Sequence, residues 1–378
     1  MDDYLGKITC SLFFFLAFLQ SCTSPSTNHP VLQSNVNVTY AKGFSINKTD
    51  DYTRIVVKDP WDSAAILHDY VLMPEGKILP DSLSGATRVT VPVKRLACLY
   101  TLHAGMLDDL GVLSKVVAVA EPEYIDIPAI TDGLKKGAVK NLGQSASVDI
   151  ERLIEAQPDL IIASPLQGVG YGNMEKCGIP IAEDASYMEN SPLGRAEWIK
   201  FIAAFVGRSD EADSLFGEIE KRYLSLKALV KDEATRPTIF SEKKYGQTWY
   251  VPGGKSYMAT LFADAGCEYP WMDTPESGSI PLSIESVYEK AEKCDYWVIK
   301  DGAPHDLTYA SLASESKLYT GFYAWRSKKI IYTNTMKSRY FEKGTLQPDQ
   351  ILADFIHLIH PELLPDHAPV YFKMMDDE

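Results

Sequence analysis

From Arg88 onward the chain alternates short apolar stretches typical of buried strands with longer stretches typical of helices. The alternation runs twice, over residues 88–191 and again over residues 232–364, with short joints throughout. Neighbouring parallel strands need a crossover connection, which is usually a helix, so this pattern indicates parallel sheets covered on both faces. We therefore predict an α/β fold with two doubly wound lobes.

Residues 192–231 separate the two halves and contain neither a strand pattern nor an internal proline. Apolar residues from Trp198 to Leu226 mostly follow a helical stripe, which is interrupted at Gly207. A helix or helix pair of roughly 35 residues, at about 1.5 Å per residue, is long enough to bridge two domains. The sequence predicts a bridging helix here.

The first 22 residues are typical of an export signal. Residues 8–19 are mostly apolar, too few to span a bilayer but suited to the core of a secretory signal. Residues 19–22, Leu-Gln-Ser-Cys, resemble a bacterial lipobox, which predicts lipidation at Cys22 and anchoring at the cell envelope, on the periplasmic side. Two observations leave an ordinary cleaved signal open: the segment begins with Asp2 and Asp3 rather than with basic residues, and Cys22 is also compatible with no modification.

Three further segments complete the predicted organisation. Residues 23–35 are rich in Ser, Thr, Asn and Pro and suit a flexible tether. Residues 36–87 alternate aromatic or β-branched positions with polar ones, which predicts a small N-terminal β extension of three antiparallel strands. Residues 365–378 are expected to form a tail.

Composition restricts the function classes. The 378 residues carry a net charge of -14, which argues against nucleic acid or an anionic lipid surface as the main partner. Besides Cys10 and Cys22, the cysteines are isolated from one another and form no CxxC pair, so a zinc ribbon or a thioredoxin-like site is disfavoured. Export permits disulfides, and the sequence leaves their pairing open.

A weak internal repeat links the two halves. Residues 149–162 and 283–299 each place a helix N-cap residue, an apolar residue and a glutamate ahead of a buried strand. Taken singly, Glu151 and Glu285 are explained by a favourable interaction with the helix dipole. Taken as a pair on equivalent positions of two lobes, they predict a two-point anionic docking surface.

These features, in this order, resemble the cobalamin- and ferric-siderophore-binding family of ABC-transporter substrate-binding proteins. The resemblance covers residues 88–364 and rests on LDDLGVLSKVVAV, NLGQSASVDIERLIEAQPDLIIAS, VPGGKSYMATLFADAGC and IPLSIESVYEKAEKCDYWVI. It implies two rigid lobes bridged by a helix, a metal chelate held between them, and delivery of that chelate to the membrane subunits of an importer. Glu151 and Glu285 match the family's glutamates that meet arginines of those subunits. The extension at residues 36–87 is not a core family feature, and its role stays open.

The resemblance also implies a monomeric receptor that is not an enzyme and needs no cofactor besides its ligand. The sequence agrees, because it contains no G-x-S-x-G elbow that would support the alternative of an exported hydrolase. An adhesion or assembly lipoprotein on the same scaffold is a further alternative. His357 and His360 have a spacing that can ligate metal, but His360 ends a helix before Pro361, so we expect no metal site.

Ligands of open α/β sheets bind at the carboxyl ends of the strands. Aromatic, charged and amide residues follow the expected strands, and we predict that they contact the ligand: Tyr100, His103, Tyr124, Gln144, Tyr245, Trp249, Arg339 and Tyr340. Aromatic rings offer flat contact surface, and arginine pairs with carboxylate or hydroxamate oxygens. Cobalamin binders often carry an aromatic residue at the place of Gln144, so this glutamine, together with Lys337 and Arg339, favours an anionic ferric complex (siderophore or haem). A corrinoid is the alternative ligand.

Overall fold

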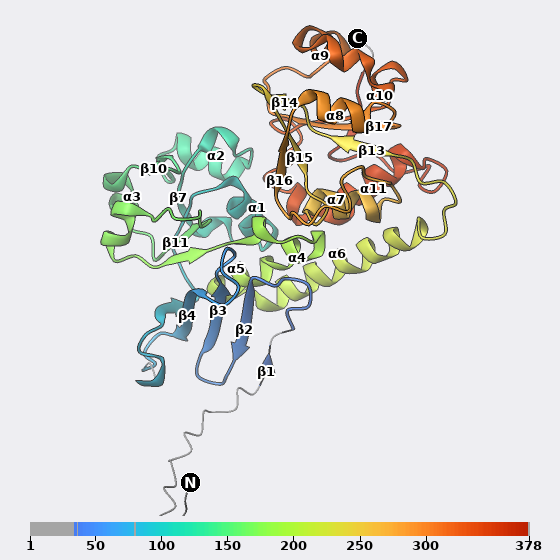
Figure 1. The fold of residues 1–378 in the computed structure, drawn as a ribbon. Helices are drawn as coiled ribbons and strands as arrows, with labels where there is room; N and C mark the ends of the chain where they lie inside the picture. Colours follow the sequence, from blue (N-terminus) through green and yellow to red (C-terminus); the bar gives the residue numbers. More distant parts are fainter. Residues whose placement is uncertain (1–33, 36, 79–80, 377–378) are drawn as a thin grey trace, which may run out of the picture. The chain divides into compact units, whose positions relative to one another are not determined.

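The computed structural model describes residues 34–35, 37–78 and 81–376, all within the compact unit Gln33–Glu378 (Figure 1). The predicted signal, the lipidation site Cys22 and nearly all of the predicted tether lie outside the described residues. None of the described helices is long and apolar enough to cross a membrane.

The N-terminal extension is a five-stranded sheet in sequential order: β1 (Ser34–Asn35), β2 (Phe44–Lys48), β3 (Thr53–Lys58), β4 (Ile66–Pro74) and β5 (Thr87–Val91). Its first four strands pair antiparallel, but β5 pairs parallel with β4. The extension is therefore larger than the three antiparallel strands that the sequence predicts.

The stretch VTVPVKRLACLY, residues 89–100, has a pattern that predicts one buried strand, but it divides between β5 and β6 (Leu96–Cys98), which belong to different sheets. Pro92 has no backbone N–H and cannot continue a ladder. The N–H of Val93 instead donates to the carbonyl of Phe205, on the bridging segment. The single-strand prediction is wrong for this reason, and the chain crosses here from the extension into the first lobe.

The N-terminal lobe is built on a wholly parallel sheet with the strand order β12-β11-β6-β7-β8. The other strands and the helices of this lobe are β7 (Val116–Val119), β8 (Lys140–Asn141), β11 (Leu160–Ala163), β12 (Ile181–Glu183), α1 (Thr101–Asp109), α2 (Pro128–Lys135) and α3 (Ile150–Ala156), with a small hairpin of β9 (Gly143–Gln144) and β10 (Ser147–Val148). Every residue of β11 and β12 is buried, as expected for strands covered on both faces.

The bridging segment forms three consecutive helices, α4 (Pro192–Glu197), α5 (Ile199–Val206) and α6 (Ser209–Leu229). Gly207 ends α5 with a positive φ of 73°, a conformation that suits glycine and accounts for the interruption of the apolar stripe. The long helix α6 packs against α5 at one end and against α11 (Pro348–Ile359) at the other (Figure 1).

The C-terminal lobe has a sheet of order β13-β17-β18-β19 and a separate antiparallel sheet of order β14-β15-β16. Their bounds, with those of the helices, are β13 (Ile239–Ser241), β14 (Lys244–Tyr245), β15 (Thr248–Pro252), β16 (Ser279–Leu282), β17 (Tyr296–Asp301), β18 (Ile330–Asn334), β19 (Lys373–Met374), α7 (Tyr257–Asp264), α8 (Ile284–Ala291), α9 (Tyr309–Glu315) and α10 (Tyr323–Arg326). The first three strands of the larger sheet are parallel. Two α/β lobes with mainly parallel sheets confirm the predicted fold class.

The last described residues, up to Asp376, belong to this lobe instead of forming a separate tail. β19 pairs antiparallel with β18, and Phe372 is buried. The fully buried carboxylate of Asp354 on α11 accepts hydrogen bonds from the backbone N–H groups of Val370, Tyr371 and Phe372. A buried carboxylate is stable only when it is hydrogen-bonded in this way, so it holds the end of the chain against the lobe.

Candidate ligand-binding site

A cavity of 1220 Å³ lies at the carboxyl ends of the parallel strands of both lobes. From the N-terminal lobe its wall includes Tyr100, which follows β6, and Tyr124, which follows β7. From the C-terminal lobe it includes Lys243 after β13, Lys300 at the end of β17 and Met336 after β18. This is the edge at which open α/β sheets bind ligands, and the volume lies above the usual range of roughly 300–1,000 Å³ for small-molecule sites.

Aromatic and apolar side chains are exposed along the cavity wall. Those that are both exposed and part of the lining are Tyr124, Leu166, Tyr187, Tyr245, Tyr250, Met336 and Phe341. Tyr245 is 84% exposed, although a tyrosine ring in an ordinary surface position usually covers some apolar neighbour. Exposed apolar side chains that gather in one concave place are typical of a binding site for a bulky ligand.

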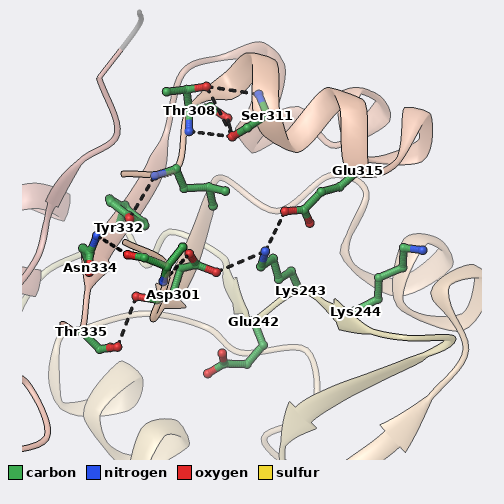
Figure 2. A network of polar contacts seen from close by, with 12 residues as sticks. Glu242, Lys243, Lys244, Asp301, Thr308, Ser311, Glu315, Tyr332, Asn334 and Thr335 are labelled. Carbon is green, nitrogen blue, oxygen red and sulfur yellow. Dashed lines mark hydrogen bonds and ion pairs between the residues drawn. The ribbon is translucent and has the colours of Figure 1, made fainter. Parts of the chain in front are cut away.

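Lys243 is neutralised by two carboxylates. Its Nζ lies 3.2 Å from Asp301 at the end of β17 and 2.7 Å from Glu315 on α9 (Figure 2). Burial alone would lower the pKa of this ammonium group, but the hydrogen bonds and charges of Glu315 and Asp301 outweigh that effect and raise it. Lys243 is therefore charged and already compensated.

Two further bases of the cavity wall also have acidic partners. Lys300 contacts Glu242, and Arg339 contacts Glu342. Glu342 is only 2% exposed and also accepts a hydrogen bond from the backbone N–H of Asp126 in the other lobe. Arg339 has a φ of 58°, a left-handed conformation that is costly for a non-glycine residue and is often retained at functional sites.

Arg195 on α4 is the fourth base of the cavity wall, and no described carboxylate forms an ion pair with it. Its Nη2 donates to the carbonyl of Tyr187 at 2.7 Å and its Nε to that of Glu189 at 3.0 Å. The guanidinium carbon lies 4.3 Å from the ring centroid of Tyr257, a cation–π contact. Burial lowers the pKa of Arg195, but an arginine remains protonated at neutral pH. Among the four bases of the described cavity wall it is the one without an ion-pair partner, although the charge of the nearby Glu189 carboxylate also acts on it.

Around Arg195 the wall is phenolic. The Tyr257 hydroxyl is buried and has no hydrogen-bond partner among the described residues. Burial raises the pKa values of Tyr257 and Tyr340, so both phenols stay neutral and can donate. A ligand oxygen between Arg195 and Tyr257 would accept one hydrogen bond from the charged guanidinium and one from the neutral phenol. It would thereby satisfy the Tyr257 hydroxyl, which has no partner among the described residues.

The wall formed by the N-terminal lobe is acidic. Glu121, Glu123 and Asp126 line it, and none of them forms an ion pair with a described lysine or arginine. Glu121 accepts hydrogen bonds from the backbone and hydroxyl of Ser145. Lys337, part of the basis for expecting an anionic ligand, lies outside the lining and pairs with Asp306 at 3.0 Å. The cavity is thus less cationic than the sequence suggested.

Five of the eight predicted ligand-contacting residues line the cavity: Tyr100, Tyr124, Tyr245, Arg339 and Tyr340. His103 lies beneath Tyr100, fully buried, with Nε2 3.5 Å from the Asp184 carboxylate. Gln144 is outside the lining and donates its amide N–H to Glu123 at 3.1 Å. The structure therefore places neither His103 nor Gln144 in the cavity wall.

Trp249 lies in the core of the C-terminal lobe and not in the cavity wall. Its side chain is fully buried, packed against Phe240, Trp297 and Tyr319, and its Nε1 donates to the carbonyl of Ser241. Side chains alternate along a strand, so on β15 Trp249 faces the core and the next residue, Tyr250, faces the cavity. The prediction that Trp249 contacts the ligand is wrong by one position of the strand.

Arg195 and Tyr257 are the residues that sequence reasoning missed. The signal for Arg195 was a base within PLGRAEW, whose only other charged residue is Glu197, at a point where the chain begins a buried helix. A charged residue in such a place is rarely buried without a partner, and this pattern therefore indicates a candidate ligand contact. Tyr257 gave no distinguishing signal, because it lies in an ordinary amphipathic pattern.

The two predicted docking residues lie outside the cavity lining. Glu151 is the second residue of α3 and Glu285 the second residue of α8, and both are exposed. Each helix begins with a side-chain cap, from Asp149 and Ser283 respectively. The two helices thus begin with the same local arrangement, one on each lobe.

His357 and His360, three residues apart at the end of α11, have different partners. His357 bonds the carbonyl of Leu364 through Nδ1, whereas His360 lies within 4.8 Å of Glu233 and Glu362. The Nδ1 of His360 is 4.0 Å from Glu362, while its unpartnered Nε2 faces the backbone of Gly266. None of these residues lines the cavity.

Two α/β lobes joined by helices, with a cavity at the strand ends of both, define a two-lobe solute-binding protein. The chain belongs to the periplasmic binding protein family, whose model matches residues 96–335. This confirms the resemblance found in the sequence.

Three similar proteins illustrate the family. An uncharacterised lipoprotein of Methanocaldococcus jannaschii is 25% identical over 92% of this chain and 88% of its own. The iron(3+)-hydroxamate-binding protein FhuD of Bacillus subtilis is 26% identical over 45% of this chain and 50% of its own. The periplasmic heme-binding protein HutB of Vibrio cholerae has the same fold, with a TM-score of 0.55, 18% identity and coverage of 68% of this chain and 96% of its own.

Proposed function

We propose that this protein is the receptor of an ABC importer and binds a ferric complex, of the hydroxamate siderophore class, in the cavity between its lobes. The observation that carries the ligand class is the charge distribution of the cavity: Arg195 has no ion-pair partner among the described residues, whereas the rest of the wall is paired or acidic. A strongly anionic complex would meet Glu121, Glu123 and Asp126, whereas a near-neutral ferric hydroxamate would not.

The hydroxamate class also matches what Arg195 offers. Hydroxamate oxygens carry negative charge while the complete ferric trihydroxamate is close to neutral, so one oxygen can accept from the guanidinium without bringing net charge into the cavity. The exposed aromatic side chains of the wall would cover the organic backbone of such a ligand. The FhuD relative, whose name states iron(3+)-hydroxamate binding, supports this choice.

Ligand titration tests the proposal. Purified protein would be titrated with ferrichrome, ferrioxamine B, haemin and cyanocobalamin in parallel, followed by intrinsic fluorescence and native mass spectrometry, with the iron-free siderophores as controls. We expect stoichiometric binding of a ferric hydroxamate, which is recovered unchanged. Binding of haemin alone would show that the iron complex is haem instead of a siderophore. Binding of cyanocobalamin alone would show that the ligand is a corrinoid instead of an iron complex. Chemical conversion of a bound ligand would overturn the receptor function.

Anchoring and delivery are part of the same proposal. Lipidation at Cys22 would keep the receptor at the envelope. The Methanocaldococcus relative is named a lipoprotein, which supports this part of the proposal. Glu151 and Glu285 would meet basic residues of the membrane subunits, one from each lobe. Cys22→Ser is expected to release the protein from membranes, and unchanged retention after this substitution would exclude an anchor at that residue.

A further inference from the structure

Residues 39–43, just before β2, are irregular, yet each of their five backbone N–H groups donates to a glutamate, either Glu189 before α4 or Glu197 at its end. The N–H groups of residues 39–41 donate to the Glu197 carboxylate at 2.7–3.1 Å. Those of Lys42 and Gly43 donate to Oε1 of Glu189 at 2.8 Å each. Five consecutive N–H groups thus enclose two carboxylates, an arrangement known from anion-binding backbone nests.

Both carboxylates depend on this segment. Glu197 is fully buried and Glu189 is 7% exposed. A buried carboxylate is costly unless hydrogen bonds replace its lost hydration. Lys200 is the nearby base, with its Nζ 3.2 Å from Glu197 and 2.9 Å from the carbonyl of Asn37. The N-terminal segment 39–43 therefore supplies most of the hydrogen bonds that replace the lost hydration of Glu189, just before α4, and Glu197, the last residue of α4.

Glu189 connects this segment to the cavity. Its carboxylate holds Lys42, Gly43 and the indole N–H of Trp198, and its backbone carbonyl accepts the Nε–H of Arg195 at 3.0 Å. A shift of Glu189 would consequently move an acceptor that orients the guanidinium.

The packing around α4 is tight on the same side. A Cβ on Gly194, the residue before Arg195, would lie 3.2 Å from the carbonyl oxygen of Tyr40. The rings of Phe44 and Trp198 are 4.7 Å apart. The extension thus packs against α4 at Tyr40, within the hydrogen-bonded segment, and against Trp198 just after α4 through Phe44, which leaves α4 little room to shift.

We propose that residues 39–43, through Glu189 and Glu197, position Arg195 in the cavity. The N-terminal extension then sets ligand affinity although none of its described residues lines the cavity. This inference rests on the proposed function insofar as Arg195 contacts the ligand. Glu189 and Glu197 are positioning residues, since they act through Arg195 rather than on the ligand.

The test compares Glu189→Ala and Glu189→Gln with the control Asp264→Asn. Asp264 is a similarly buried carboxylate, held by Tyr223 and Lys227, but it has no contact with the N-terminal segment. Each full-length variant would be measured for stability by urea unfolding, for ferrichrome affinity, and for the NMR signal of the Arg195 Nε–H. Arg195→Lys assigns that signal.

We expect Glu189→Ala to shift or broaden the Arg195 signal and to weaken ferrichrome binding roughly fivefold to tenfold, the effect of one partly lost hydrogen bond to a charged group. Glu189→Gln keeps an oxygen acceptor and should show a smaller change of the same kind. Asp264→Asn should lower stability and leave both the signal and the affinity unchanged.

A loss of stability in both Glu189 variants, with signal and affinity unchanged, would show a purely structural role and overturn the proposal. If Glu189→Ala does not fold, Glu189→Gln carries the comparison. If the parent protein binds no ferrichrome, the proposed ligand class fails, and the Arg195 signal still decides whether the segment positions that residue.

Discussion

The Glu342 carboxylate lies 2.9 Å from the backbone nitrogen of Asp126, so a buried acid of the C-terminal lobe holds a loop of the N-terminal lobe. The next residue, Lys343, reinforces the contact through ion pairs with Asp108 and Asp109 on α1. Beneath them, a Cβ on Gly105 would lie 1.9 Å from the carbonyl oxygen of Glu342. The two lobes therefore meet backbone to backbone at this point.

Gly105→Ala tests that close approach. Alanine stabilises a helix by about 1 kcal/mol relative to glycine, but at Gly105 the methyl group would push the Glu342 segment away. We expect a lower midpoint in urea unfolding. Gly217→Ala on α6 is the control, because nothing lies within 4 Å of a Cβ there, and it should raise the midpoint. Equal effects of the two substitutions would contradict the contact.

Arg195→Gln is expected to weaken binding of the ferric hydroxamate by about tenfold to a hundredfold, since losing a charged hydrogen bond costs about 1.5–3 kcal/mol. The control is Arg208→Gln, an exposed arginine of the bridging segment that pairs with Glu211 and does not line the cavity. Fluorescence titration of both variants gives the comparison. A full-affinity Arg195→Gln protein would remove Arg195 from the binding site.

Adjacent residues of β15 should behave oppositely. Trp249→Ala is expected to destabilise the protein by about 3–5 kcal/mol, the usual range for a fully buried large aromatic residue. Tyr250→Ala should leave the free energy of unfolding within about 1 kcal/mol and weaken ligand binding, because this ring is 46% exposed in the cavity wall. Urea unfolding and ligand titration of both variants check the facing of the strand. The reverse pattern would show that the strand is turned over.

Reversing both proposed docking residues, Glu151→Lys with Glu285→Lys, should abolish uptake of the proposed ligand while ligand affinity stays within about twofold, because neither residue lines the cavity. Glu155→Lys with Glu289→Lys makes the same charge change on the same two helices and serves as the control. Uptake of labelled ferric hydroxamate would be measured in cells that have this protein as sole receptor. If uptake persists when Glu151 and Glu285 are reversed but is lost when Glu155 and Glu289 are reversed, the docking surface includes the second pair instead of the first.

The described cysteines are free, and their reactivity should follow burial. Burial raises the pKa values of Cys98, Cys267 and Cys294 to about 12, so their thiolate form is favoured only above that pH. At pH 8 the thiolate fraction is on the order of 10⁻⁴, whereas half-exposed Cys177 remains accessible. Iodoacetamide should label Cys177 in the native protein and the other three only after unfolding. Rapid native labelling of Cys98 would contradict its burial.

Strand and helix alternation was sufficient to predict the α/β lobes, because hydrophobic periodicity reports directly which elements are buried. The same reasoning failed at Trp249, since alternation along a short strand shows that one face is buried but leaves open which one. It also failed at Pro92, where hydrogen bonding to a distant carbonyl decides the strand boundary.

The cavity was harder to predict than the fold. The position of the cavity at the strand ends followed from the sheet topology. The residues expected there, Tyr100 and Arg339, do lie in the cavity wall. The pairing of Lys337 with Asp306 did not follow, because it is a long-range contact that only the folded chain creates, whereas Glu342, the partner of Arg339, lies three residues along the chain. Arg195 was not predicted, because its importance depends on the lack of an ion pair with any described carboxylate, and only the folded chain reveals that lack.

The hydrogen bonds between the N-terminal segment and Glu197 join residues 156–158 positions apart in sequence. In a chain that crosses a membrane from its N-terminus, this segment therefore emerges long before the carboxylates that it needs. Its sheet β1–β5 has local partners and can pair early, but the docking of that sheet onto the bridge waits for the middle of the chain, as expected for contacts of high sequence separation. Residues 39–41 are thus expected to be among the last to reach their final contacts, although they lie near the N-terminus.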